Sequence, residues 1–142
     1  MRKLAAIFMI MGILGCAQPA AAQDPAEAVK EKAIAAAEQW LELVDLGQYE
    51  ASWENAADLF KQAVTKDEWV VAVERARSPM GRVLSRRVES ASYETSLPGA
   101  PDGEYVVIQY VTSFENKESA VETITPVRDN DNTWRVSGYY IR

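Results

Sequence analysis

The spacing of the apolar residues changes at Gly81, and this change narrows the folds that the chain can adopt. Before Gly81, apolar residues recur every three or four positions, which is typical of helices with one buried face. After it, β-branched and aromatic residues alternate with polar ones, as in strands with one buried face. Helices followed by strands favour an α+β fold, because a parallel α/β fold would alternate the two along the chain.

The first predicted helix covers residues 24–46. It starts at an Asp-Pro pair, a common helix start, and Gly47 follows it where a left-handed C-terminal cap is expected. Its apolar positions at helical spacing are Val29, Ala33, Ala37, Trp40, Leu41 and Val44. Glu38, Glu42 and Asp45 are predicted to lie on the opposite, solvated face.

Two further helices are predicted to follow. One covers residues 49–64, and Asp58 in its middle is a place where it could break into two. The other begins at Thr65, because Thr65 and Glu68 have the spacing of a capping box, in which each side chain bonds the other residue's backbone N–H. The Ser-Pro-Met-Gly sequence at residues 78–81 ends it.

Four strands are predicted in the second half of the chain. They cover residues 82–95, 105–114, 120–128 and 133–142. In the first, the apolar positions change from even-numbered to odd-numbered, so a bulge is expected near Glu89–Ser90. In the third, Pro126 indicates an edge strand or a second bulge, because proline cannot donate to a neighbouring strand. In the fourth, Trp134, Val136, Gly138 and Tyr140 are expected on one face. The predicted architecture is three N-terminal helices packed on the concave side of a curved four-stranded antiparallel sheet.

Residues 1–22 have the three-part layout of a secretory signal peptide. Two basic residues open the chain, residues 4–15 form an uncharged apolar run, and Ala22 ends a small-residue cleavage site. We therefore expect export, to the periplasm in the first instance, and a single mature domain over residues 23–142.

Cys16 suggests a second processing route. Residues 13–16, Ile-Leu-Gly-Cys, resemble a lipobox, in which the cysteine receives lipid. The two cleavage signals overlap, and the small-residue site favours cleavage after Ala22. In the alternative, the protein is an outer-membrane lipoprotein attached through Cys16; without that lipid no membrane attachment is expected, because an acidic domain does not dock on anionic lipid.

The composition of the mature part argues against several functional classes. The 15 Lys and Arg residues include Arg2 and Lys3, so 13 of them face 21 Asp and Glu residues after the signal peptide. Such an acidic domain repels nucleic acid. The chain contains no histidine and no cysteine after Cys16. We therefore expect no metal site, no cofactor, no internal disulfide and no Ser-His or Cys-His catalytic pair.

The aromatic residues suggest a binding pocket between the helices and the sheet. The candidates for its lining are Trp40, Tyr49, Trp53, Phe60 and Tyr110. A pocket of this kind would suit a small apolar ligand. In the alternative, the same rings fill the interior, which is the commoner role of buried aromatic residues.

Two charged clusters are interpreted as solvated surface. The Asp-Asn-Asp-Asn sequence at residues 129–132 has oxygen ligands at alternate positions, but it lacks the glycine and the glutamate of a usual calcium loop and is predicted to be a hairpin turn. The basic cluster consists of Arg75, Arg77, Arg82, Arg86 and Arg87. These arginines are predicted to face water rather than an anionic partner.

Two stretches resemble a known family. Residues 96–142, which begin SLPGAPDGEY and end WRVSGYYIR, and residues 40–69, which contain GQYEASW, resemble the bacterial family called domain of unknown function 4019. The resemblance implies a cone-shaped fold like that of nuclear transport factor 2. It brings no catalytic motif.

Enzymes with that fold, such as relatives of ketosteroid isomerase, keep a carboxylate and a tyrosine or histidine inside the cone. The acid–base candidates here are Asp45, Tyr49, Glu54 and Asp58, and all can equally face water. We therefore expect a non-catalytic binding or interaction module of the cell envelope, with a lyase-like or isomerase-like enzyme as the weaker alternative. Its partner is an unidentified protein or a small apolar ligand, and a homodimer through the sheet is a further candidate.

Overall fold

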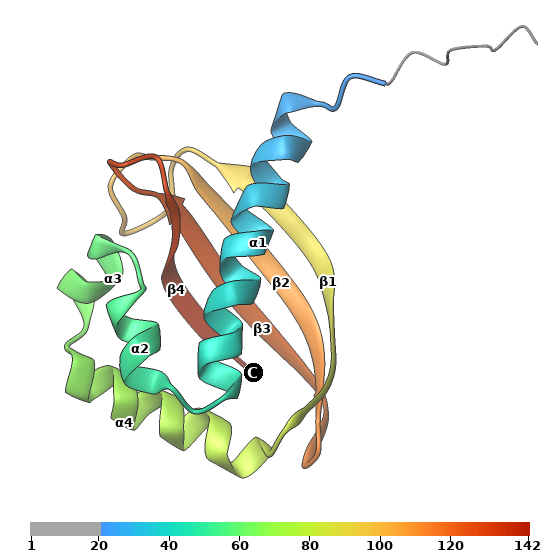
Figure 1. Ribbon diagram of the computed structural model, residues 1–142, viewed down its shortest axis with the longest axis vertical. Coiled ribbons are helices and arrows are strands. Elements are labelled where there is room, and N and C mark those ends of the chain that lie inside the picture. Colours follow the sequence, from blue (N-terminus) through green and yellow to red (C-terminus); the bar gives the residue numbers. More distant parts are fainter. Residues whose placement is uncertain (1–20) are drawn as a thin grey trace, which may run out of the picture.

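The computed structural model describes residues 21–142, which form an α+β fold (Figure 1). Cys16 and nearly all of the predicted signal peptide lie outside these residues. The helices are α1 (Pro25–Asp45), α2 (Tyr49–Glu54), α3 (Asp58–Ala63), α4 (Lys66–Arg77) and a short 3-10 helix, η1 (Ser78–Met80). The strands that follow are β1 (Val83–Glu94), β2 (Tyr105–Phe114), β3 (Lys117–Arg128) and β4 (Trp134–Ile141). Within residues 21–142, no helix combines the length and the apolar content that crossing a bilayer requires.

The predicted helix ends are confirmed at both long helices. An Asp24 carboxylate oxygen accepts a hydrogen bond from the Ala26 N–H at 2.9 Å and caps the start of α1. Gly47, just after α1, has the left-handed φ of 73° that glycine adopts without strain. At α4, Thr65 and Glu68 form the reciprocal bonds of a capping box. These local signals act within one turn of the chain, which is why the sequence pattern finds them.

The second predicted helix is broken into two, α2 and α3, and α3 begins at Asp58, where the sequence indicates a possible break; residues 21–142 therefore contain four α-helices instead of three. The backbone turns extended at Ala57, with φ −64° and ψ 154°. The Ala57 N–H then donates to the carbonyl of Val136 in β4 at 2.8 Å. The helical hydrogen bonding is interrupted where the backbone of Ala57 bonds to the sheet instead, and this bond joins residues that are far apart in the sequence.

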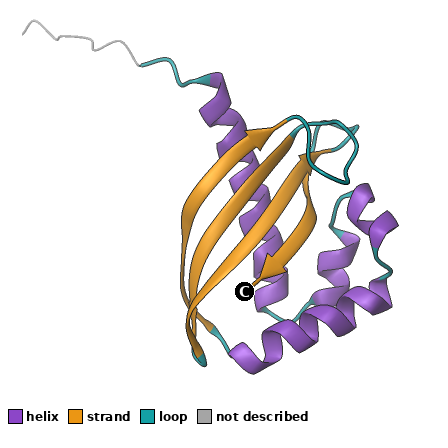
Figure 2. Cartoon of the chain, turned by 180° about the vertical axis from the view of Figure 1, so that it is seen from behind, coloured by secondary structure: helices purple, strands orange, loops and turns teal. Residues whose placement is uncertain are grey.

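The strands form one antiparallel sheet in the order β1-β2-β3-β4, so that each strand pairs with its neighbour in sequence. α1 lies along one face of the sheet and contacts every strand, whereas α2 and α3 lie next to β4 (Figure 1). Figure 2 shows the opposite face, which no helix of residues 21–142 covers. The core residues between α1 and the sheet include Val106, Ile108, Ile124 and Val136, all buried.

The bulge predicted in β1 is confirmed. Val88 pairs with Tyr110, and Ser90 pairs with the next residue of β2, Gln109, so that Glu89 is the additional residue. The extra residue moves the inward positions of β1 from even to odd numbers. The change in apolar parity along β1 therefore has a direct structural cause.

The prediction for Pro126 is half right. β3 lies inside the sheet, so an edge position is wrong, but a register shift does occur between Thr125 and Pro126. Thr125 pairs with Gly138 and Pro126 with Val136, which makes Ser137 the additional residue and puts the bulge in the partner strand. The Ser137 hydroxyl closes the bulge by donating to the Thr125 carbonyl at 2.7 Å.

This second bulge decides which C-terminal tyrosine faces the core. The prediction that Tyr140 shares a face with Val136 is wrong, because Ser137 shifts the alternation by one residue. Tyr139 instead pairs with Ile124 on the inner face, and the Tyr140 side chain is 62% exposed.

Four rings, one each from α1, α3, α4 and β4, pack together, and we call them the aromatic cluster: Trp40, Phe60, Trp69 and Tyr139. The centroids of the contacting rings lie 5.0 to 6.5 Å apart. Both indole N–H groups are satisfied by Ser52, whose carbonyl accepts from Trp40 at 2.8 Å and whose hydroxyl accepts from Trp69 at 2.9 Å. The aromatic cluster is therefore a packed part of the interior.

Candidate functional site

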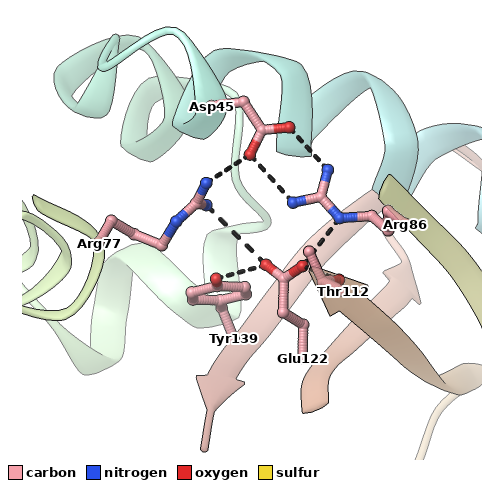
Figure 3. A network of polar contacts seen from close by, with 6 residues as sticks. All are labelled: Asp45, Arg77, Arg86, Thr112, Glu122 and Tyr139. Carbon is pink, nitrogen blue, oxygen red and sulfur yellow. Dashed lines mark hydrogen bonds and ion pairs between the residues drawn. The ribbon is translucent and has the colours of Figure 1, made fainter. Parts of the chain in front are cut away.

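Next to the aromatic cluster, four charged side chains meet between the helices and the sheet. We call Asp45, Arg77, Arg86 and Glu122 the ion cluster (Figure 3). They come from the end of α1, the end of α4, β1 and β3. The cluster contains two cations and two anions, so its formal charges cancel.

Glu122 is the fully buried member, with 0% exposure. One of its carboxylate oxygens accepts hydrogen bonds from Arg86 Nε at 2.8 Å and from the Thr112 hydroxyl at 2.6 Å. The other accepts from the Tyr139 hydroxyl at 2.6 Å. Both oxygens are thus held by neighbouring donors, as a buried carboxylate requires (Figure 3).

Asp45 joins the two arginines from the helical side. Its carboxylate accepts from Arg77 Nη2 at 2.6 Å and takes a two-pronged contact from Arg86 at 2.6 and 3.0 Å. Burial alone would raise the pKa of Asp45, but the hydrogen bonds from Arg86 and Arg77 outweigh it and hold the pKa below its ordinary value of 3.8. The prediction that Asp45 lies at the surface with Glu42 is confirmed for the residue, which is exposed, but its side chain is only 25% exposed because its carboxylate pairs with the two arginines.

The basic cluster predicted from the sequence divides into buried and solvated members. The side chains of Arg82 and Arg87 are 87% and 68% exposed, which confirms the prediction for those two. It is wrong for Arg77, which is 5% exposed, and for Arg86, whose side chain is 15% exposed, since both pair with the carboxylates of the ion cluster. Burial lowers the pKa of Arg86, but the hydrogen bonds to Asp45 and Glu122 raise it by more than burial lowers it, so Arg86 stays charged.

Arg77 is less completely satisfied than the other members. Its guanidinium lies over the Phe114 ring at 4.9 Å. Within residues 21–142, its Nε and Nη1 have no hydrogen-bond partner, and Nη1 lies 3.9 Å from a Glu122 oxygen. Arg77 is therefore held by Asp45, by the ring and by the Coulomb attraction of Glu122.

Two tyrosines line the buried side of the ion cluster. Burial and the neighbouring Glu122 carboxylate raise the pKa of Tyr139, so its hydroxyl stays protonated and donates to Glu122. Tyr110 pairs with Glu122 across β2 and β3 and is 1% exposed, and its pKa is raised by burial. The Tyr110 hydroxyl has no hydrogen-bond partner in the described chain.

The five predicted pocket residues are distributed over the fold. Trp40 and Phe60 belong to the aromatic cluster, and Tyr110 lies by the ion cluster. Trp53 is half-buried and donates from its indole to the Val64 carbonyl at 2.9 Å. Tyr49 lines a shallow hollow of about 450 Å³ on α2.

A separate groove of about 280 Å³ lies between α1 and β4. Trp40 and Trp134 line it together with the polar side chains of Gln39, Asn55 and Arg135. Of the five predicted pocket residues, only Trp40 lines this groove.

The remaining acid–base and metal candidates lie on the surface of the described chain. Glu54 is paired with Lys66 at 2.6 Å. In the hairpin turn, Arg135 contacts Asp131 at 2.8 and 2.9 Å and Asp129 at 3.1 Å, and the hydrogen bond from Arg135 lowers the pKa of Asp131. Residues 21–142 contain no group of three or more side chains placed to hold a metal ion.

The sequence interpretation missed Glu122, although the pattern around it contains a signal. Glu122 lies between Ala120 and Ile124 on the inward face of β3, so strand alternation alone places a carboxylate in the core. Arg77 similarly continues the buried stripe of α4, four residues after Val73. Inward charges of opposite sign on different elements predict a buried ion pair, because an unpaired buried charge is unstable.

The comparisons with known proteins agree with the resemblance seen in the sequence. No curated protein and no solved structure matches the chain. The family model described as "Protein of unknown function (DUF4019)" matches residues 36–139, which include the aromatic cluster, the ion cluster and all four strands except the last two residues of β4. The chain therefore belongs to the DUF4019 family.

Proposed function

We propose that this protein is an exported, non-catalytic binding module whose ion cluster stabilises the fold. The main observation behind the proposal is that both carboxylate oxygens of Glu122 accept hydrogen bonds, from Arg86, Thr112 and Tyr139, and that Glu122 is 0% exposed. A buried carboxylate whose two oxygens both accept hydrogen bonds from the protein and that does not contact solvent is poorly placed to accept a proton from a substrate. The ion cluster therefore serves packing, and binding takes place on the surface.

A lyase-like or isomerase-like enzyme is less well supported. A catalytic carboxylate must lie within hydrogen-bond reach of a substrate in a cavity. Asp45 and Glu122 line none of five hollows of the described chain, and the two candidate carboxylates that do line hollows, Glu54 and Asp58, are exposed to solvent. The aromatic cluster occupies the adjoining space with stacked rings.

Export and the finer fold type are part of the proposal. The layout of residues 1–22 supports secretion to the periplasm, with lipid attachment at Cys16 as the alternative. The placement of α1 along a curved antiparallel sheet is compatible with a cone like that of nuclear transport factor 2 (Figure 2). The intact mass of the protein purified from cells separates the two processing routes, since cleavage after Ala22 leaves an unmodified chain that starts at Gln23.

A small-ligand binder is a second candidate, and the groove between α1 and β4 favours it. Trp40 and Trp134 offer apolar ring surface there, while Asn55 and Arg135 offer polar contacts at the rim. An apolar fluorescent dye tests this candidate. We expect saturable dye binding that Trp134→Ala removes, with Trp53→Ala as the matched control; dye binding that both variants retain would exclude the groove.

A second copy of the chain is a further candidate partner. The sheet face opposite α1 carries the half-buried side chains of Val107, Val111 and Val121, with no helix of the described chain over them. Light scattering of the purified protein would show a dimer, and Val111→Lys would convert that dimer to a monomer if this face forms the contact.

The proposal of a structural ion cluster is tested by chemical labelling of carboxylates. A carbodiimide with a small amine modifies carboxylates that solvent can reach, and mass spectrometry of peptides locates the modified residues. We expect Glu122 to stay unmodified in the folded protein and to react once urea unfolds it. Glu118, an exposed residue of the same strand, should react in both states. Modification of Glu122 in the folded protein at the rate of Glu118 would contradict the proposal.

A further inference from the structure

β4 is an edge strand, and its two halves differ in how the edge is covered. Near its start, the Ala57 N–H donates to the Val136 carbonyl and closes the edge. Near its end, Arg142 exchanges both backbone hydrogen bonds with Val121 of β3, at 2.9 and 3.1 Å. In an antiparallel pair the bonded positions alternate, so Tyr139 and Ile141 direct their backbone groups away from β3.

The outward backbone groups at Tyr139 and Ile141 have no backbone partner within residues 21–142. Natural edge strands are usually protected by charged side chains, by proline or by a covering element. The last half of β4 reads Gly-Tyr-Tyr-Ile and has neither a charged side chain nor proline before Arg142. This half of the edge is therefore open to strand pairing.

An apolar groove of about 200 Å³ runs beside the open half of the edge. Trp69, Ala72, Val73 and Ala76 of α4 form one wall, and the last residues of β4 form the other. An edge strand flanked by a helix with an apolar groove between them is the arrangement that binds extended peptides by strand addition. The backbone of the peptide pairs with the edge, and its alternate side chains enter the groove.

We infer that the open half of β4 and the groove on α4 bind an extended, net-positive peptide segment of another protein. The inference rests on the proposed binding function and names its partner class. Unpaired N–H and C=O groups at alternate residues are complementary to another extended backbone. The excess of 21 Asp and Glu residues over 13 Lys and Arg residues in the mature part favours a partner with basic residues through charge complementarity.

A library of displayed ten-residue peptides, selected against the purified protein, provides the probe. We expect selected peptides to alternate apolar residues and to carry Lys or Arg outside the apolar positions. Binding should slow hydrogen exchange at the amides of Tyr139 and Ile141. N-methylation of the peptide at residues that pair with β4 should weaken binding by about tenfold or more, while methylation at the intervening residues should not, because only the former bond the edge.

A matched pair of variants locates the site. Ala72→Trp fills the groove from an exposed position of α4 and should weaken peptide binding by about tenfold or more, which corresponds to the loss of one well-placed side-chain contact. Ala35→Trp, at an exposed position of α1, should leave binding unchanged. The thermal unfolding temperature of both variants verifies that they are folded.

Three results would overturn the inference. The first is failure to select any peptide. The second is that selected peptides slow hydrogen exchange at Asn55 and at the groove of α1 instead, which would still agree with a binding function. The third is protection from hydrogen exchange at Tyr139 and Ile141 that becomes stronger at higher protein concentration when no peptide is present. This result would show that a second copy of the chain pairs with the edge. Failure of the proposed function is recognised separately, by modification of Glu122 in the folded protein.

Discussion

The aromatic cluster and the ion cluster lie side by side between the helices and the sheet, yet they hold the fold in different ways. Rings such as Phe60 and Trp69 interact through contacts with little directional demand, so a neighbour can move to fill a lost contact. Each charge of the ion cluster depends on an oppositely charged partner, and Glu122 has no access to water. An apolar ring such as Phe60 can therefore change on its own, whereas the charged positions have to change together.

The largest expected effect comes from Glu122→Gln. The substitution keeps the shape of the side chain but leaves Arg86 and Arg77 with Asp45 as their remaining carboxylate. Breaking a buried ion pair from one side costs about 3–5 kcal/mol of the free energy of unfolding, which urea titration measures. Glu118→Gln, on the exposed end of β3, is the matched control and should change stability by less than about 0.5 kcal/mol. Equal effects of the two substitutions would contradict a structural ion cluster.

Thr112→Val should have the next largest effect. It removes the hydroxyl that donates to Glu122 at 2.6 Å and keeps the volume of the side chain. A hydrogen bond to a charged group contributes about 1.5–3 kcal/mol, so urea titration should show a loss in that range. Thr112→Ser keeps the hydroxyl and should retain more of the stability than Thr112→Val. The reverse order would mean that packing, and not the hydrogen bond, matters at this position.

Phe60→Leu tests the tolerance of the aromatic cluster. Leucine keeps an apolar contact with Trp40 and Trp69 but loses the edge-to-face ring geometry. We expect a loss of about 1 kcal/mol in the free energy of unfolding, since neighbouring rings can close part of the space. A loss as large as that of Glu122→Gln would remove the contrast between the two clusters.

The smallest expected effect is the part of the stability loss at low pH that comes from protonation of Asp45. The folded pKa of Asp45 lies below its ordinary value of 3.8, so its carboxylate contributes fully to stability above that value and loses the contribution as the pH falls through the lowered pKa. Urea titrations at about pH 6 and about pH 3 should therefore show a smaller decrease in stability for Asp45→Asn than for the unaltered protein. Identical decreases would show that Asp45 is not paired in solution.

Most of the fold could be predicted because its signals are local. The capping box at Thr65 and the parity change at Glu89 each depend on a few consecutive residues, and both are confirmed. The break before Asp58 and the bulge opposite Pro126 were predicted as alternatives, but the contacts that fix them, from Ala57 to β4 and from Ser137 to β3, join distant segments and could not be predicted. The same reason explains the candidate site: the pairing of Asp45 with Arg77 and Arg86 could not be predicted because the two arginines lie far along the chain.

The meander order of the sheet has a consequence for how the chain assembles. Each strand pairs with its sequence neighbour, so the sheet needs only hairpin closures, which are short-range steps. The ion cluster, in contrast, is complete only when the ends of α1 and α4 reach β1 and β3. An apolar stripe on a helix can dock one turn out of place at modest cost, but such a slip would carry Asp45 about 5.4 Å away from Arg86. The paired charges thus favour the correct docking register of α1, because a slipped helix would leave Arg77 without the carboxylate that it bonds and Arg86 with Glu122 alone.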